Sequence, residues 1–221
     1  MTSRHRRGFA TRSTLMVLIA ALAAGLGMFA AQHFFAPARP LAGIAAGQLK
    51  SVRLISPPRE TPSYRLTLAD GSAVTPATLR GHWTVVFLGF THCPDVCPTT
   101  LAELAKAQDS WRRLPEAIRP RLLFVSVDPE RDSPAKTGEF ARYFHADTLA
   151  ASAEPVALAG FAQALGLVYM KVPLDNGDYS MDHSATLVLL DPQGRQAGLI
   201  RPPLIWQDIA GDLAVLAQGS R

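Results

Sequence analysis

Cysteine is scarce in this sequence, and its scarcity excludes whole classes of protein. The 221 residues contain only two cysteines, Cys93 and Cys97, which are separated by three residues. A bridge closing so short a loop would restrict the unfolded chain very little, so a fold stapled by disulfides is excluded. The chain has no second cysteine pair and no His-x-x-x-His, which also argues against a four-ligand zinc module. We therefore expect the two cysteines to serve chemistry rather than stability.

The start of the chain first lacks acidic residues and then lacks charged residues of either sign. Residues 1–12 contain four arginines and no acid, and residues 13–35 contain no Lys, Arg, Asp or Glu. An apolar helix needs roughly 20 residues, at about 1.5 Å each, to cross a bilayer. We predict a basic cytoplasmic segment over 1–12 and one transmembrane anchor over 13–35. Because positive charge stays on the cytoplasmic side, the anchor lies in the inner membrane and the rest of the chain in the periplasm.

A cleaved secretory signal is the alternative interpretation of this start. The Ala-Pro-Ala sequence at 36–38 has the small residues of a cleavage site. The uncharged run exceeds the usual length of a signal core, which favours the anchor. Either interpretation delivers the remaining chain to the same side of the membrane.

The arginines at the start also account for the net charge. They supply all of the formal charge of +4, so residues 13–221 are neutral overall. A neutral domain has no global basic field, and nucleic acid is not a predicted partner.

The rest of the chain is interpreted as a linker followed by one domain. Residues 36–59 contain four prolines with small residues between them, which is typical of an extended tether. Residues 60–221 are enough to bury a single core, and they contain no internal repeat.

Within 60–221 the apolar pattern alternates between strands and helices. Short continuous apolar runs predict buried strands, and prolines at the start of the following periodic segments suit the first turn of a helix. We expect strands at 64–68, 85–90, 122–127, 167–172, 185–190 and 196–200, and helices at 98–111, 133–144, 154–165 and 206–217. This order predicts an α/β domain with a central sheet, flanking helices and parallel early strands.

The cysteine pair lies where a predicted strand gives way to a helix, in the segment FTHCPDVCPTT at 90–100. Ligand sites in α/β sheets lie beyond the carboxyl ends of the strands. Cys97 directly precedes Pro98, so it lies near a helix N-terminus, whose partial positive charge favours the thiolate. A thiolate is both the nucleophile of disulfide exchange and a preferred ligand of Cu(I). The pattern leaves both functions open, although exchange usually uses a two-residue spacer.

His183 is the candidate third ligand, because it lies in a polar stretch just before the strand predicted at 185–190. A loop histidine taken alone is more often simply solvated. His92 is a weaker candidate, since it flanks Cys93 and would point away from a site that faces the sulfurs. Met181 carries a soft thioether, but a covering role in the core is more typical of methionine.

Two carboxylates are candidates for a supporting role. Asp128 follows the strand predicted at 122–127. It either accepts a hydrogen bond from the imidazole or caps a turn. Asp182 directly precedes His183 and belongs to a set of loop acids that could select a partner.

Three separated motifs resemble the Sco/SenC family. They are FLGFTHCPDVCPTTL at 87–101, VSVDPERD at 125–132, and DHS at 182–184 followed by a strand and DPQG at 191–194. The resemblance runs in order from about residue 64 to the C-terminus, although the wording at 148–153 departs from the family pattern. It implies a thioredoxin-like fold and copper, as Cu(I) or Cu(II), held by Cys93, Cys97 and His183. It also implies delivery of copper to the dinuclear copper site of cytochrome c oxidase subunit II, or reduction of the cysteines of that site.

The sequence and the resemblance together predict a membrane-anchored copper chaperone outside the cytoplasm. Its expected partners are subunit II or another copper-accepting protein, and a thioredoxin-like reductant for an oxidised pair. The competing prediction is an enzyme, either a thiol-disulfide oxidoreductase or a thiol peroxidase, in which Cys93 and Cys97 are the redox-active catalytic residues. Pure redox function would survive the replacement of His183.

Overall fold

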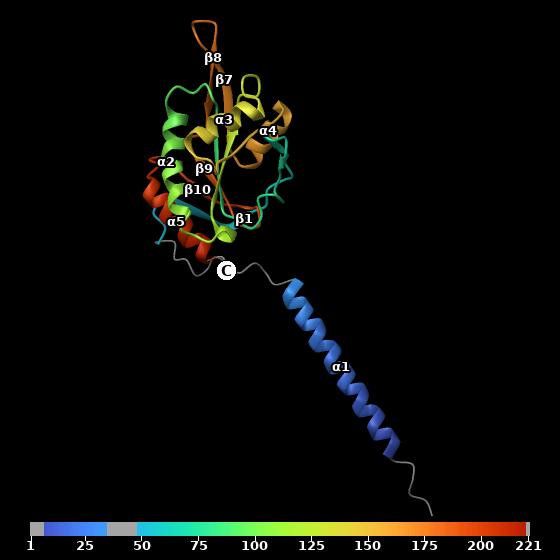
Figure 1. Cartoon of the computed structure of the whole chain (residues 1–221). Coiled ribbons are helices and arrows are strands. Elements are labelled where there is room, and N and C mark those ends of the chain that lie inside the picture. Colours follow the sequence, from blue (N-terminus) through green and yellow to red (C-terminus); the bar gives the residue numbers. More distant parts are fainter. Residues whose placement is uncertain (1–6, 35–47, 220–221) are drawn as a thin grey trace, which may run out of the picture. The chain divides into compact units, whose positions relative to one another are not determined.

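The computed structural model describes residues 7–34 and 48–219, which belong to two separate units (Figure 1). The first unit holds one helix, α1 (Arg7–Phe34). Its described side chains, 14–28, are all exposed. Across the described residues, no helix combines the length and the apolar character that a membrane crossing requires.

The second unit is built on an eight-stranded mixed sheet with the order β1-β10-β9-β4-β5-β6-β2-β3. The strands are β1 (Val52–Arg59), β2 (Leu66–Leu68), β3 (Ala73–Val74), β4 (Thr84–Gly89), β5 (Arg121–Ser126), β6 (Leu149–Ser152), β9 (Leu187–Leu190) and β10 (Gln196–Ile200). The helices are α2 (Val96–Trp111), η1 (Glu116–Ile118), α3 (Pro134–Phe144), α4 (Pro155–Ala164) and α5 (Trp206–Gly219). β4, β5 and β6 run parallel, while β9 runs antiparallel to β4.

β4 and β5 form the centre of the core. Every residue of β4 is buried, and so is every residue of β5 except the first. Helices flank the sheet: α2 packs against α5, and α3 packs against β6. The Trp111 indole of α2 donates a hydrogen bond to the Ala210 carbonyl of α5 at 3.2 Å. The predicted α/β domain with a central sheet, flanking helices and parallel early strands is confirmed.

The last part of the predicted linker is a strand in the structure. Residues 52–59, which the sequence analysis assigned to a tether, form the edge strand β1 and pair with β10. An edge strand tolerates proline because one of its sides makes no ladder hydrogen bonds, and the register shifts between Leu54 and Arg59, around the two prolines. The buried Asp212 carboxylate of α5 accepts hydrogen bonds from the backbone N–H groups of residues 50–52 at 2.8 to 3.0 Å. Nothing in the sequence near residues 50–52 predicted these hydrogen bonds to Asp212.

A separate two-stranded sheet carries the predicted histidine ligand. It consists of β7 (Tyr169–Pro173) and β8 (Tyr179–His183), which pair antiparallel with Tyr169 opposite His183. The strand predicted at 167–172 corresponds to β7, whereas β8 was expected only as a polar stretch. β6 is a further strand that the sequence did not reveal. In Figure 1 the hairpin projects from one end of the domain.

Candidate metal centre

The cysteine loop joins the end of β4 to the start of α2, as predicted, although the helix begins at Val96, two residues earlier than expected. Cys93 is half-buried and Cys97 is fully buried in the first turn of α2; both are free thiols. The backbone N–H of Cys97 donates a hydrogen bond to the Cys93 sulfur at 3.3 Å. One of the N–H groups left open at the start of a helix is thereby satisfied by a sulfur atom.

Gly89, the last residue of β4, makes room for the buried sulfur. A Cβ at this position would lie 2.7 Å from Phe124 Cε2 and 3.0 Å from Cys97 Sγ. Both distances are shorter than an ordinary van der Waals contact. Only glycine therefore lets the helix start approach the strand this closely.

His183 ends β8 and faces the cysteine loop. Its Nε2 lies 3.5 Å from Cys97 Sγ, and its Nδ1 lies 3.2 Å from the Ser184 carbonyl oxygen. A carbonyl can only accept, so the hydrogen is assigned to Nδ1 and the lone pair to Nε2, on the side of the sulfur. The ring centres of Phe87 and Phe90 each lie 6.1 Å from the centre of the imidazole, in an edge-to-face arrangement.

Burial keeps the imidazole and the thiol neutral. It lowers the pKa of His183, against weaker opposing effects of Ser184 and Asp182. It raises the pKa of the Cys97 thiol, so the helix N-terminus does not dominate as the sequence analysis expected. In the metal-free protein the site holds a neutral imidazole, and Cys97 must lose its proton to act as a thiolate ligand.

The donor atoms suit a soft metal ion. Two sulfurs and one neutral imidazole nitrogen match the preference of Cu(I), and they can also hold Cu(II). The three donors are not yet as close as metal ligands, since among the described residues only His92, Asp128 and Asp132 have ligand atoms all within 4.8 Å of one another. Capture of an ion by Cys93, Cys97 and His183 therefore requires the three donor atoms to move closer together.

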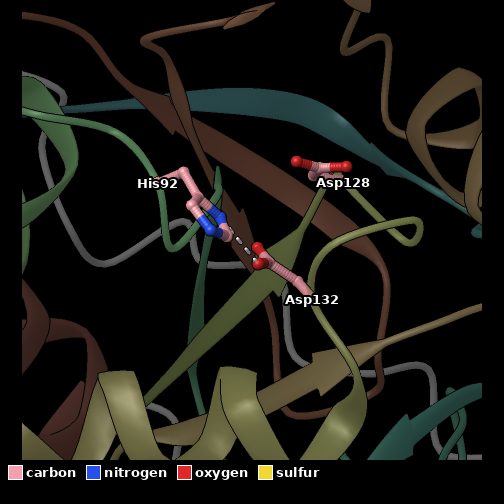
Figure 2. Close-up of side chains that lie close together, drawn as sticks. All are labelled: His92, Asp128 and Asp132. Atoms are coloured by element: carbon pink, nitrogen blue, oxygen red, sulfur yellow. Dashed lines mark ion pairs between the residues drawn. The ribbon is translucent and has the colours of Figure 1, made fainter. Parts of the chain in front are cut away.

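The group of His92, Asp128 and Asp132 (Figure 2) is already occupied by protein cations and donors. Asp132 is fully buried and accepts hydrogen bonds from the Thr91 N–H at 2.8 Å, the Thr91 hydroxyl at 2.5 Å and the Ser126 hydroxyl at 2.7 Å. The exposed His92 lies 3.5 Å from Asp132 and has the Lys136 ammonium 3.2 Å from its Nε2. A Lys ammonium at this position opposes a second cation, and Asp132 ties the cysteine loop to the segment after β5.

The two predicted supporting carboxylates differ in what they contact. The buried Asp128 pairs with the Arg131 guanidinium and accepts a hydrogen bond from the Tyr179 hydroxyl at 2.9 Å. The His183 Nδ1 contacts the Ser184 carbonyl rather than Asp128, and Asp128 contacts the hairpin through Tyr179. Asp182 is exposed and favours the protonated form of the imidazole through its charge.

Sequence reasoning missed the side chains that fasten the hairpin, Tyr179 and Arg131. The Arg131 guanidinium carbon lies 3.6 Å from the centre of the Tyr179 ring. Met181, between Tyr179 and His183 on β8, is buried as expected of a covering residue. The only signal in the sequence was the charged run Asp-Pro-Glu-Arg-Asp at 128–132, directly after the strand predicted at 122–127. Nothing in this run identified a partner about 50 residues away.

Comparisons with known proteins point to one family. The SCO1/SenC family model matches residues 53–218. A protein described as copper-binding from Stutzerimonas stutzeri is 34% identical over 156 residues, 70% of this chain and 75% of that protein. The structure of ScoI from Bradyrhizobium japonicum with copper bound is 35% identical, with a TM-score of 0.64 over 71% of this chain and 98% of that one.

A third likeness extends to the fold alone. BsSco, described as a member of the Sco family of cytochrome c oxidase assembly proteins with a disulfide switch, is 22% identical, with a TM-score of 0.58 over 73% of this chain and 95% of that one.

Proposed function

Because this chain belongs to the SCO1/SenC family, we propose that it is a copper chaperone, anchored in the inner membrane, that holds copper through Cys93, Cys97 and His183 in the periplasm. The observation that carries the proposal is the 3.5 Å approach of His183 Nε2 to the Cys97 sulfur. The copper-bound relatives support the choice of metal. The run 13–35, which lacks charged residues, supports the anchor.

The chemistry of the site suits a carrier rather than a permanent metal centre. Cys97 is sealed in the core, whereas Cys93 is half-buried and remains open to an approaching acceptor. Thiolates and thioethers of an acceptor can replace these ligands one at a time, because soft ligands exchange readily on Cu(I). We propose subunit II of cytochrome c oxidase as the acceptor, since the family is tied to assembly of that enzyme.

The proposal is tested by anaerobic Cu(I) titration of the reduced full chain in detergent against a competing chelator. We expect one tightly bound equivalent. In His183→Ala and Cys97→Ser the affinity should fall at least about 100-fold, since loss of a mere supporting partner of a ligand already costs 10- to 100-fold. His92→Ala is the matched control, because this histidine is exposed and faces Asp132. Binding that is tight and indifferent to His183 would contradict the ligand set.

A second function, thiol-disulfide exchange, is favoured by the asymmetry of the pair. In the reduced pair, the more accessible Cys93 thiolate can attack a substrate disulfide and form a mixed disulfide with release of one substrate thiolate. The Cys97 sulfur can then attack Cys93, which releases the second substrate thiolate and leaves Cys93 and Cys97 joined in a disulfide. We expect a copper-free oxidised pair to require reduction before it can accept copper. If His183→Ala retains full reductase activity towards a peptide disulfide while losing Cu(I), the two functions are separable.

A further inference from the structure

The hairpin that carries His183 does not pair with any strand of the main sheet. Over residues 48–219, β7 and β8 pair only with each other. Backbone hydrogen bonds therefore set the register within the hairpin. Its position against the cysteine loop is left to the short segment 184–186, which joins it to β9, and to side-chain contacts. Side chains that contact the hairpin lie in the segment 128–131, which follows β5.

The ring of Tyr179 is held between two cations. The Arg131 guanidinium carbon lies 3.6 Å from the ring centre and the Lys171 ammonium nitrogen lies 3.8 Å from it. A cation within about 6 Å of an aromatic face is attracted by the ring quadrupole. The hydroxyl of the same ring donates to the buried Asp128 carboxylate at 2.9 Å. Tyr179 thus uses both ring faces and its hydroxyl in contacts that fasten the hairpin.

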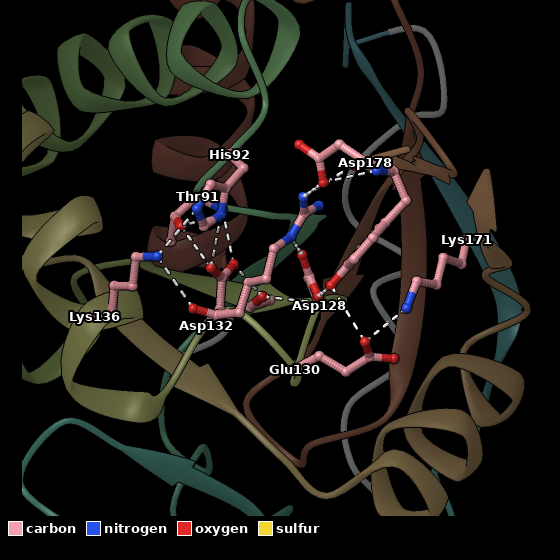
Figure 3. Close-up of polar contacts among 11 residues, drawn as sticks. Thr91, His92, Asp128, Glu130, Asp132, Lys136, Lys171 and Asp178 are labelled. Atoms are coloured by element: carbon pink, nitrogen blue, oxygen red, sulfur yellow. Dashed lines mark hydrogen bonds and ion pairs between the residues drawn. The ribbon is translucent and has the colours of Figure 1, made fainter. Parts of the chain in front are cut away.

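Arg131 and Glu130, in the segment after β5, contact the hairpin through hydrogen bonds and an ion pair. Arg131 Nε donates to Asp128, and its Nη1 donates to the Tyr179 carbonyl at 3.0 Å and to Asp178 at 3.2 Å. Lys171 of β7 pairs with Glu130 at 2.6 Å. Figure 3 shows Asp128 and Glu130 next to Asp178 and Lys171. We name the set formed by Asp128, Glu130, Arg131, Lys171, Asp178 and Tyr179 the hairpin clamp.

We propose that the hairpin clamp, with Tyr179 at its centre, positions His183 against Cys97 and thereby sets the metal affinity of the site. Tyr179 and His183 are four residues apart on one strand, so both side chains point to the same face of β8. A strand of this length is stiff, and holding one end of it fixes the other. The inference rests on the proposed function only where it concerns copper.

Release of the clamp has two consequences. An undocked hairpin removes the imidazole from the site, so the apparent dissociation constant rises in inverse proportion to the docked fraction. It also uncovers Cys97, whose sulfur has no exposed surface while His183 lies beside it. The second consequence requires no metal and can be measured in the metal-free protein.

The test is the alkylation rate of Cys97 in the reduced, metal-free full chain carrying Cys93→Ser, so that one thiol is left to react. His183→Ala gives the rate of the uncovered sulfur. Tyr179→Leu removes both cation–π contacts and the hydroxyl, and we expect the rate to rise about tenfold. Tyr143→Leu is the matched control: this tyrosine is 86% exposed on α3, and its loss should leave the rate unchanged.

Two milder variants guard against misfolding. Tyr179→Phe keeps the ring between the cations and loses only the hydroxyl, and Lys171→Met removes one cation, with Lys106→Met on α2 as its control. Each should raise the rate by about threefold, between wild type and Tyr179→Leu. If Tyr179→Leu does not fold, the alkylation rates of Tyr179→Phe and Lys171→Met, each compared with wild type and with the Lys106→Met control, decide the question. Wild-type rates in all folded Tyr179 and Lys171 variants would overturn the proposal.

Copper supplies the second readout. With Cys93 restored, Tyr179→Leu should weaken Cu(I) binding about tenfold, while Tyr179→Phe should recover most of the affinity. If the wild-type protein binds no Cu(I), the proposed function fails, and the alkylation rates still decide whether the clamp holds the hairpin. If copper binds tightly but equally in Tyr179→Leu and wild type, the clamp does not set affinity.

Discussion

The two halves of the candidate metal centre are held in place by different means. The cysteine half is part of the main core: β4 is buried along its length, and Asp132 accepts two hydrogen bonds from Thr91 of the cysteine loop and one from Ser126 at the end of β5. The histidine half is a two-stranded hairpin held by side chains, most of them at least partly exposed. Local stability in proteins follows such differences in burial. The cysteine half is therefore the fixed part of the site, and the histidine half the adjustable part.

The largest expected effect breaks the cysteine half. Asp132→Ala removes a fully buried acceptor and leaves the donors of Thr91 and Ser126 unpaired. Because each buried unpaired donor costs about 1–3 kcal/mol, we expect the free energy of unfolding to fall by about 3 kcal/mol, measured by urea denaturation. Asp175→Ala at the exposed hairpin tip is the control and should change little. A loss under about 1 kcal/mol for Asp132→Ala would show that the two halves are equally loose.

A smaller loss is expected from Gly89→Ala. The new methyl group would meet the Phe124 ring at 2.7 Å and the Cys97 sulfur at 3.0 Å. Overpacking of this kind costs about 1–3 kcal/mol, again measured by urea denaturation. Gly160→Ala in α4 has open space around its Cβ and should stabilise the protein by about 0.5–1 kcal/mol. Equal effects of the two substitutions would refute the close approach at β4.

Breaking the histidine half should barely change global stability. Glu130→Gln removes the exposed ion pair with Lys171, and such pairs contribute about 0–1 kcal/mol. We expect the unfolding free energy to change by less than about 0.5 kcal/mol, as in the matched variant Glu103→Gln, which removes the Lys106 pair on α2. A loss of more than about 2 kcal/mol would place the hairpin within the main cooperative unit.

The smallest effect concerns pH and sharpens the comparison within the hairpin. Burial, and then the hydrogen bond to Asp128, raise the pKa of Tyr179 to about 12. A raised folded-state pKa contributes stability below the unfolded value of about 10, and this contribution is lost as the pH rises from about 10 to 12. The difference in phenolate absorbance between wild type and Tyr179→Phe should therefore titrate near pH 12. A midpoint near pH 10 would show that the hydroxyl faces water.

Much of the fold was predictable because the buried strands are continuous apolar runs. The segments 85–90 and 122–127 appear as β4 and β5, and Ser133 caps α3 through its hydrogen bond from the Lys136 N–H. β1 was missed because its prolines indicate a tether, while the carboxylate that anchors the strand lies about 160 residues later in the sequence. Local pattern contains no information about such distant partners.

The parts of the site that lie together in the sequence were predictable, and the contacts between distant segments were not. The cysteine motif lies in one loop, and the structure brings His183 to it, which the resemblance to a known family had implied. The position of the histidine in the sequence alone could not establish this. β8 is a polar strand, and its Tyr179 ring packs against Arg131 and Lys171. Asp128 was recognised as a candidate, but its route to the site through Tyr179 depends on the packing of two segments far apart in the sequence.

The hydrogen bond from His183 Nδ1 to the Ser184 carbonyl has a stoichiometric consequence. With that ring hydrogen committed to the backbone, the imidazole meets an incoming ion without giving up a proton, so any acid released on loading comes from the two sulfurs alone. The heat of metal binding should then vary with the ionisation enthalpy of the buffer in proportion to the thiol protons displaced.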